Sequence, residues 1–340
     1  MNLKAIVKGS LGAAGASPLL RHYARRSALR SINVVYYHYV GLPGPHYCAF
    51  YKGCTAAKFA KDLQRLHRVF DFAPLGEILE PGRAQGDGRR PALAVTFDDG
   101  FNLWDNPVME ILDRFGVKAT SFVITSVVGN TRMMWRHILS AIESLAAEAV
   151  WRREYNELAV SAGITPIGRK EPLLKAASRW EMHRKDEWAG LLWERCNLPP
   201  VEVYLEERRP YFDWRGLRAW LAAGHSVGFH THTHPYCSRL QRADLEGELV
   251  LPAIDLKRRL GITELFLSYP FGDRLQPALE QEIFSGGLFK GLFGIRGFAP
   301  KGVSHDKLER AGIEGHDGGW EVFRGLFCGT RQSTHDLKGY

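Results

Sequence analysis

The sequence predicts an α/β fold in which parallel strands alternate with helices and one long helical segment interrupts the alternation. Three observations support this prediction. Short apolar runs recur between amphipathic helical stretches over residues 32–124. The same alternation returns after residue 212. Residues 131–212 are rich in Trp, Arg, Glu, Leu and Ala and show no strand alternation, so we expect about two to four helices there.

The expected elements each have a local cause. Helices are expected where a capping residue precedes an apolar stripe, beginning after Thr55, Asn106 and Asp213, and a fourth is expected over residues 240–260. Gly116, Gly224 and Gly261 follow three of these stripes and are expected to end them. Strands are expected from short apolar runs at residues 32–37, 92–97, 117–124, 226–229, 265–269 and 288–295. Because the order is strand, helix, strand, the strands should be parallel with right-handed crossovers.

Length, composition and charge limit the class of protein. The chain has 340 residues, of which 45% are apolar and 24% charged, which suits one large globular domain or two ordinary ones. Its formal charge of +8 is spread along the chain, which argues against a nucleic-acid binder. Spread positive charge suits an acidic or phosphorylated substrate or an anionic surface. The 5 cysteines are scattered, which favours a reducing compartment without disulfides.

The first thirty residues are interpreted as a basic N-terminal arm. Lys4, Lys8 and Pro18 interrupt its apolar stretch, so it does not resemble a secretory signal. The arm is either a frayed terminus or an amphipathic segment that contacts an anionic membrane surface. Without a recognisable secretory signal, we predict a cytoplasmic location, with the inner face of the membrane as a variant. No apolar run approaches the roughly 20 residues needed to cross a bilayer. Residues 326–340 are expected to form a C-terminal tail.

Three polar clusters follow predicted strands. Residues 92–97 end in Asp98, Asp99 and Gly100, and two adjacent carboxylates repel each other unless a positive group lies beside them. Residues 226–229 lead into the run 230–235, His-Thr-His-Thr-His-Pro, and residues 265–269 lead into Pro-Phe-Gly. Solvated turns are the plain alternative. Because the carboxyl ends of parallel strands form the rim at which barrel enzymes have their active sites, we expect the three clusters to meet.

Carboxylate and imidazole are ligands that a hydrolytic zinc ion prefers, usually three from the protein with a fourth position for water. His230 and His234 are four residues apart, and a tight helical turn would put both rings on one side, with His232 pointing away. One carboxylate and two histidines at the same rim therefore predict a metal site.

These clusters resemble the motifs of a known family, the polysaccharide deacetylases. The segments that carry the resemblance are Thr96-Phe97-Asp98-Asp99-Gly100, His230-Thr231-His232-Thr233-His234-Pro235 and, as a variant of the third motif, Ser268-Tyr269-Pro270-Phe271-Gly272. The strand at 32–37 with His38 resembles an N-terminal feature of one branch. The resemblance covers about residues 31–320 apart from the insertion. It implies a distorted (β/α)7-type barrel, which we assign to residues 31–325, with a helical insertion at residues 131–212.

The resemblance also implies roles for site residues. Asp99, His230 and His234 would bind one divalent ion, with zinc preferred and cobalt or another divalent metal as alternatives. Asp98 would be the general base. The backbone N–H of Phe271 would hold the oxyanion together with the metal.

Two departures from the family pattern stand out. Ser268 occupies the position at which many members carry an arginine that orients the base, and Arg274 or Arg296 could substitute. The family's general-acid histidine near the C-terminus has no clear counterpart. His316 and His305 are the candidates, and we take His316 as the catalytic one.

The resulting prediction is a metal-dependent hydrolase that removes an N-acetyl or N-formyl group from an amino sugar. The substrate would be a polysaccharide, a glycolipid or a sugar precursor, in a bacterial cell-surface polysaccharide pathway. A non-catalytic carbohydrate-binding protein that retains the metal is the alternative, motivated by the two departures. A two-metal phosphoesterase would need more rim ligands than the chain offers. The insertion is either a lid or a packing element, and no oligomeric state is predicted.

Overall fold

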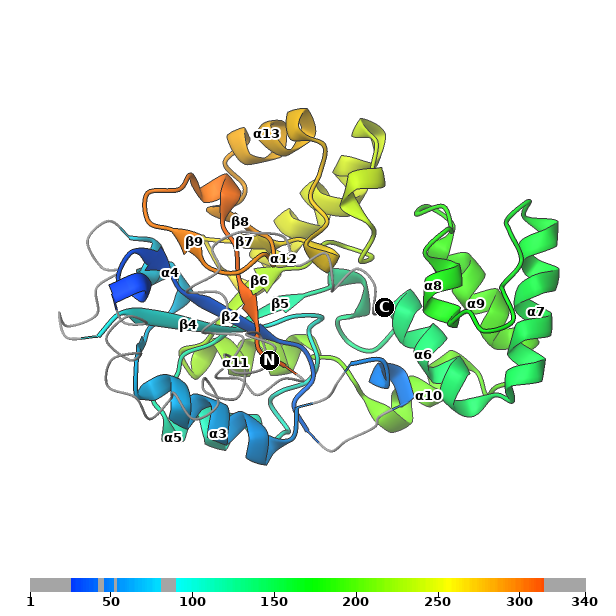
Figure 1. Ribbon diagram of the computed structural model, residues 1–340, viewed down its shortest axis with the longest axis horizontal. Coiled ribbons are helices and arrows are strands. Elements are labelled where there is room, and N and C mark those ends of the chain that lie inside the picture. Colours follow the sequence, from blue (N-terminus) through cyan, green and yellow to red (C-terminus); the bar gives the residue numbers. More distant parts are fainter. Residues whose placement is uncertain (1–25, 42–45, 52–53, 81–89, 315–340) are drawn as a thin grey trace, which may run out of the picture.

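A computed structural model describes residues 26–41, 46–51, 54–80 and 90–314. Its main sheet has the order β10-β2-β4-β5-β6-β7-β8, with β3 paired to β4, and all of these pairs are parallel. The sheet curls into a half-barrel with helices around it (Figure 1), as the α/β barrel prediction expects. The strands are β2 (Val34–Tyr37), β3 (Asp71–Phe72), β4 (Ala92–Phe97), β5 (Thr120–Val123), β6 (Ser226–Phe229), β7 (Phe266–Ser268), β8 (Gly291–Phe293) and β10 (Ala311–Gly312).

The helices around the sheet begin and end near the expected residues. The Thr55 side chain accepts a hydrogen bond from the N–H of Lys58, and Asp213 accepts one from Gly216, so these two of the three predicted N-caps are confirmed. The side chain of Asn106 accepts from the N–H of Val108 at 3.2 Å, but the N-cap position before α5 is Pro107. The helices are α3 (Ala56–His67), α4 (Leu75–Leu79), α5 (Val108–Arg114), α11 (Trp214–Ala222), α12 (Leu251–Leu260) and α13 (Pro277–Ser285). The helix expected over residues 240–260 instead consists of a 3-10 turn, η4 (Arg242–Asp244), a π turn, η5 (Glu246–Val250), and α12.

The strand expected at residues 32–37 is interrupted. The buried side chain of Asn33 donates to the carbonyls of Ala28 and Ala92, at 3.0 and 2.9 Å. This separates β1 (Ser31–Ile32), which pairs antiparallel with β9 (Ala299–Pro300), from β2 in the main sheet. The strands β1, β3, β9 and β10 have two residues each, which is too short for hydrophobic periodicity to indicate.

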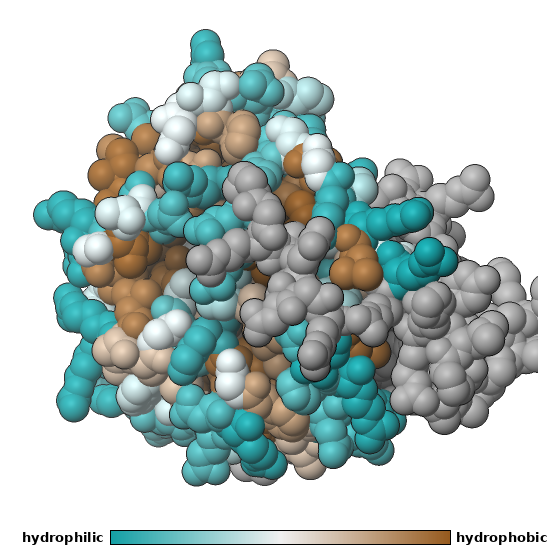
Figure 2. Space-filling model, turned by 90° about the vertical axis from the view of Figure 1, so that its left-hand side faces the viewer, coloured by the Kyte–Doolittle hydropathy of each residue, from teal (hydrophilic) through white to brown (hydrophobic). Residues whose placement is uncertain are grey.

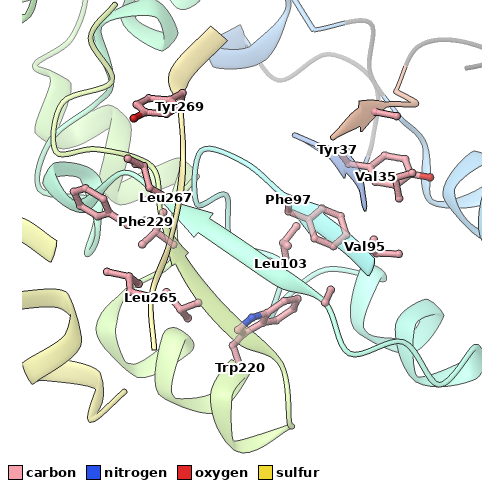
Figure 3. Close-up of a cluster of buried hydrophobic side chains, with 14 of the residues drawn as sticks. Val35, Tyr37, Val95, Phe97, Leu103, Trp220, Phe229, Leu265, Leu267 and Tyr269 are labelled. Atoms are coloured by element: carbon pink, nitrogen blue, oxygen red, sulfur yellow. The ribbon is translucent and has the colours of Figure 1, made fainter. Parts of the chain in front are cut away.

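Strand β4 is buried on both faces, as its unbroken apolar run predicted. Leu93, Val95 and Phe97 belong to the large cluster between the sheet and the helices, together with Trp220 of α11. Figure 3 shows this cluster, with side chains of β2, β4, β6 and β7 directed to the same side. Ala92 and Ala94 face a smaller cluster on the other side of the sheet. The strand ends that carry the polar clusters therefore rest on a packed frame.

Five helices lie within residues 131–212, where the pattern predicted two to four. They are α6 (Trp135–Leu145), α7 (Glu148–Ser161), α8 (Leu173–Ala177), α9 (Lys185–Arg195) and α10 (Val201–Arg208). They share a core of their own that contains the buried Trp180, Trp188 and Trp193. In Figure 1 α7, α8 and α9 project to one side of the sheet, while α6 lies nearer to it.

The described surface has scattered apolar side chains. Figure 2 shows one face, on which hydrophobic residues form patches among hydrophilic ones. The exposed large apolar residues are spread over several segments, with two of them on α12, and they are Leu29, Trp104, Leu145, Val160, Val203, Leu251 and Ile254. Among the described helices, none combines the length and the apolar character needed to cross a bilayer.

Candidate metal centre

The two carboxylates at the end of β4 are held by the neighbouring strands. The backbone N–H of Asp98 donates to the carbonyl of Tyr37 at 2.8 Å, which extends the parallel ladder with β2. Asp99 then turns out of the strand with a φ of 67°. On β6, the backbone N–H of His230 donates to Val123 of β5 at 2.9 Å. The expected meeting of strand ends at one rim is therefore present, and Asp99, His230 and His234 are all buried.

The three predicted ligands converge on one point. Oδ1 of Asp99 lies 3.4 Å from Nε2 of His230 and 3.3 Å from Nε2 of His234. A tetrahedral ion with bonds of about 2.1 Å separates its ligands by about 3.4 Å. Oδ1 is buried and accepts no hydrogen bond from the described part of the chain. The ligand atoms of Asp99, His230 and His234 lie within 4.8 Å of one another, so these residues fit one divalent ion.

A hydrogen bond sets the tautomer of His230, and burial acts on His234. Nδ1 of His230 lies 2.7 Å from the carbonyl oxygen of Ser268. Because a carbonyl only accepts, Nδ1 carries the proton and Nε2 keeps its lone pair for a metal. Burial lowers the pKa of His234 to about 3, although Asp99 opposes the shift. Burial thus favours the neutral ring of His234, which is the form that a metal requires.

The two rings are brought together by a loop and not by the helical turn that their spacing suggested. Thr231 and His234 have positive φ values of 65° and 59°. A β-branched residue in this region is a genuine outlier, and such strain costs about 1–3 kcal/mol at each residue. The Oγ1 of Thr231 accepts from the N–H of His234 at 3.0 Å, and His232 turns away to bond with Thr125. Surrounding contacts therefore hold a backbone that local sequence preference would not choose.

Asp98 is paired with an arginine that sequence reasoning missed. Nη1 and Nη2 of Arg310 lie 2.7 and 2.8 Å from the two carboxylate oxygens of Asp98, and Arg310 is fully buried. Its Nη2 also donates to Oγ of Ser268 at 2.5 Å. Burial opposes ionisation of Asp98, but Arg310 more than offsets this effect, so the pKa of the carboxyl is lowered. Asp98 is therefore ionised and fixed in orientation.

The suggested substitutes for the missing arginine do not take this position. Arg274 pairs with Glu280 at 2.8 Å, and Arg296 is exposed. Arg310 reaches Asp98 because it precedes β10, which pairs with β2, the neighbour of β4. The two residues are 212 positions apart, and a two-residue strand leaves no pattern that would indicate the pairing.

Phe271 lies against the histidine loop. It has a φ of 60°, its ring meets the ring of His234 edge-on at 4.6 Å, and it stacks on Tyr236 at 4.5 Å. The guanidinium of Arg136, from α6, lies 4.7 Å from the centre of the Phe271 ring. Gly272 is required beside it, since a Cβ there would lie 2.4 Å from Ile295. The third cluster therefore reaches the same rim.

His38, at the carboxyl end of β2, is a second group that the site prediction did not include. Its Nδ1 lies 2.7 Å from Glu314, and its ring stacks on Tyr51 at 4.3 Å. Burial favours the neutral ring, but the hydrogen bond and charge of Glu314 dominate and raise the pKa to about 9. The side chain is 21% exposed. A protonated imidazole thus lies at the rim near Asp98 and Asp99.

The structure describes only one of the two histidines that were predicted as general acids. His316 lies outside the described residues. His305 begins η7 (His305–Lys307) and lies next to Gly291, the first residue of β8. That is the end of β8 opposite the rim, so the fold adds no support for His305 as the acid.

Tyr51 and α6 of the insertion approach Oδ2 of Asp99, the oxygen that does not face His230 and His234. The hydroxyl of Tyr51 donates to Oδ2 of Asp99. Nε2 of His137, in α6, lies 3.5 Å from the same oxygen. The indole N–H of Trp135, also in α6, donates to the carbonyl of His234 at 3.0 Å. Sequence pattern indicated none of these contacts, because they join segments that share no local motif.

The comparisons with known proteins agree with this architecture. A sequence model described as polysaccharide deacetylase matches residues 85–283. The structure of the Streptococcus pyogenes deacetylase PplD is similar at a TM-score of 0.54 and 16% identity, covering 87% of this chain and 98% of that one. IcaB from Ammonifex degensii gives 0.51 and 18%, with coverages of 87% and 97%. At these identities the structures show the fold alone. No curated protein sequence matches significantly.

Proposed function

Because the chain belongs to the polysaccharide deacetylase family, a metal-dependent family of carbohydrate-acting hydrolases, we propose that it removes an N-acetyl or N-formyl group from an amino sugar. The observation that carries the proposal is the buried group of Asp99, His230 and His234 with Asp98 beside it. PplD, one of the similar structures, is a deacetylase described in complex with acetate. A polysaccharide, a glycolipid or a sugar precursor would serve as substrate.

Asp99, His230 and His234 would hold the ion, with zinc as the first choice. When bound, the ion would polarise the amide carbonyl and lower the pKa of a water molecule to about 7. Asp98 would take the proton of the attacking water, which needs an ionised carboxylate in a fixed orientation. Arg310 provides both properties. The N–H of Phe271 would donate to the oxyanion, a type of contact worth about 3 kcal/mol of barrier.

The leaving amine needs a proton, and we propose His38 as its donor in place of His316. Glu314 binds Nδ1 of His38, which leaves Nε2 to face the substrate. The raised pKa keeps this ring protonated at neutral pH. Asp98 would keep one proton of the attacking water, and His38 would give its proton to the leaving nitrogen as the C–N bond breaks, so that water and the N-acyl sugar form an amine and a carboxylic acid. Return of the Asp98 proton to His38 through solvent would restore both groups.

Removing Glu314 tests the role of His38. Glu314→Gln is expected to lower the pKa of His38, because the carboxylate is the main group that raises it. The acid must be protonated, so the alkaline limb of kcat/KM should move to lower pH, by about one unit. Activity at pH 6 should change little. His316→Gln is the matched control, and an unchanged limb in Glu314→Gln together with a large loss of kcat in His316→Gln would return the role to His316.

The function itself is tested by acetate and formate release. Purified protein loaded with Zn2+ should release acetate or formate from N-acylated amino-sugar oligomers, and a chelator should abolish release. The alternative, a non-catalytic carbohydrate-binding protein that retains the metal, rested on the missing arginine and acid. Arg310 is a candidate for the missing arginine, and His38 is a candidate for the missing acid, which weakens that alternative. Metal-loaded protein that binds the oligomers but releases neither acid would favour it. Cytoplasmic location and membrane contact of the basic arm stay predictions.

A further inference from the structure

The two oxygens of Asp99 face different groups. Oδ1 faces Nε2 of His230 and of His234, at 3.4 and 3.3 Å. Oδ2 accepts from the hydroxyl of Tyr51 and lies 3.5 Å from Nε2 of His137. Asp99 is completely buried, so neither oxygen reaches bulk solvent. One oxygen is thus directed to the ion site, and the other is directed to protein donors.

The hydrogen bonds of His137 determine which of its nitrogens carries the proton. The backbone N–H of Met134 donates to the hydroxyl oxygen of Tyr211 at 3.2 Å. That hydroxyl lies 2.7 Å from Nδ1 of His137. Among the described hydrogen bonds, Nδ1 of His137 is the acceptor that is open to the proton of the Tyr211 hydroxyl, so the hydroxyl donates to Nδ1. In the neutral ring the remaining proton is then on Nε2, the atom that faces Asp99.

His137 does not have the surroundings of an ordinary core histidine. It is fully buried, and within the described residues Nε2 has no hydrogen-bond partner at normal distance. A buried N–H without an acceptor is destabilising, and the carboxylate oxygen 3.5 Å away is the group that it can use. The ring stacks between Tyr211 and Phe50, at 5.7 and 5.9 Å, and lies 5.0 Å from Phe101. These rings fix the direction of the N–H.

We propose that the helical insertion positions a ligand of the metal centre. His137, oriented by Tyr211, donates from Nε2 to Oδ2 of Asp99. Together with Tyr51 it restricts that carboxylate to binding the ion through Oδ1. A carboxylate with both oxygens unoccupied could bind a cation through two atoms, which would add a ligand and change the geometry. His137 is therefore a positioning residue. The inference rests on the proposed function only in that Asp99 binds the ion.

The experiment compares Co2+-loaded proteins by chelator competition and by visible absorption, neither of which needs a substrate. His137→Phe keeps a flat ring but removes the donor, and Tyr211→Phe removes the hydroxyl that orients it. Each is expected to weaken Co2+ binding by about tenfold, and to change the absorption bands toward a higher coordination number. His137→Gln, which carries an N–H at similar reach, should restore most of the affinity. Tyr155→Phe, a buried tyrosine in the core of the insertion, is the matched control and should change neither readout.

X-ray absorption of the Zn2+-loaded wild type separates positioning from direct ligation. The proposal expects two imidazoles at the ion, and three would overturn it, because His137 would then be a ligand. Wild-type affinity and spectrum in a folded His137→Phe protein would also overturn it. So would a His137→Gln protein that binds no better than His137→Phe, since that result indicates a packing role. If His137→Phe fails to fold, the proposal is tested by the Co2+ affinity of Tyr211→Phe and by the number of imidazoles at the Zn2+ ion. Absence of deacetylase activity would leave these metal readouts unaffected, so failure of the proposed function is distinguishable.

Discussion

Asp98→Asn is expected to lower kcat by about 10^3-fold, because asparagine cannot take a proton from the attacking water and general-base contributions fall between about 10^2 and 10^4. Zn2+ content should stay near one per chain, since Asp98 lies beside the predicted ligand group without belonging to it. The measurements are steady-state acetate release and metal analysis of the same preparation. Full turnover with metal bound would remove Asp98 from the base role.

A second effect has to be separated from this one. Asparagine leaves Arg310 buried with its charge unpaired, and breaking a buried pair typically costs about 3–5 kcal/mol of stability. The double variant Asp98→Asn with Arg310→Met removes that charge as well. We expect it to recover much of the lost free energy of unfolding in urea while kcat stays low. A recovery of kcat together with stability would show that the single variant was inactive through misfolding.

Arg310→Met is expected to give the second large effect. The change removes two hydrogen bonds to Asp98 and those to Thr96 and Ser268. An uncompensated buried carboxylate should lower the free energy of unfolding by about 3–5 kcal/mol. It should also lower kcat/KM by at least about tenfold, because the base loses its fixed orientation.

The pH dependence of kcat/KM shows in which direction Arg310 shifts the pKa of Asp98. Arg310 is the largest factor that lowers the pKa of Asp98, and burial is the largest that raises it. Without Arg310 the pKa rises, so the acidic limb of kcat/KM should move to higher pH. Arg310→Lys keeps a charge but not the two-point contact, and should give a smaller shift with a persistent loss of kcat. An unchanged pH profile and wild-type kcat in folded Arg310→Met would contradict the assignment.

The sequence indicated much of the frame and of the ion site. The apolar run 92–97, the caps at Thr55 and Asp213 and the strand 226–229 could be predicted because each depends on neighbouring residues and local backbone geometry. The convergence of Asp99 with His230 and His234 could be predicted because parallel strands end at one rim. The spacing of the histidines suggested a helical turn, however, and that was wrong. Positive φ values at Thr231 and His234 bring the rings together instead.

The remaining parts of the site depend on contacts between distant segments. Arg310 reaches Asp98 across 212 residues, through a strand two residues long. Glu314 raises the pKa of His38 across 276 residues. The insertion could be identified as helical, but only packing decides that His137 faces Asp99 and that Tyr211 supports it.

By itself, then, the sequence determined the strand ends, the helix caps and the residues able to bind an ion, since these follow from short-range backbone and side-chain preferences. Only the tertiary structure decided which charged groups form pairs and which side chains have a shifted pKa as a result. Burial makes such pairs depend on separations of a few ångströms, and those separations are set by how the sheet closes and how the insertion packs. The pairing of Asp98 with Arg310 and of His38 with Glu314 therefore depends on the fold as well as on the motifs.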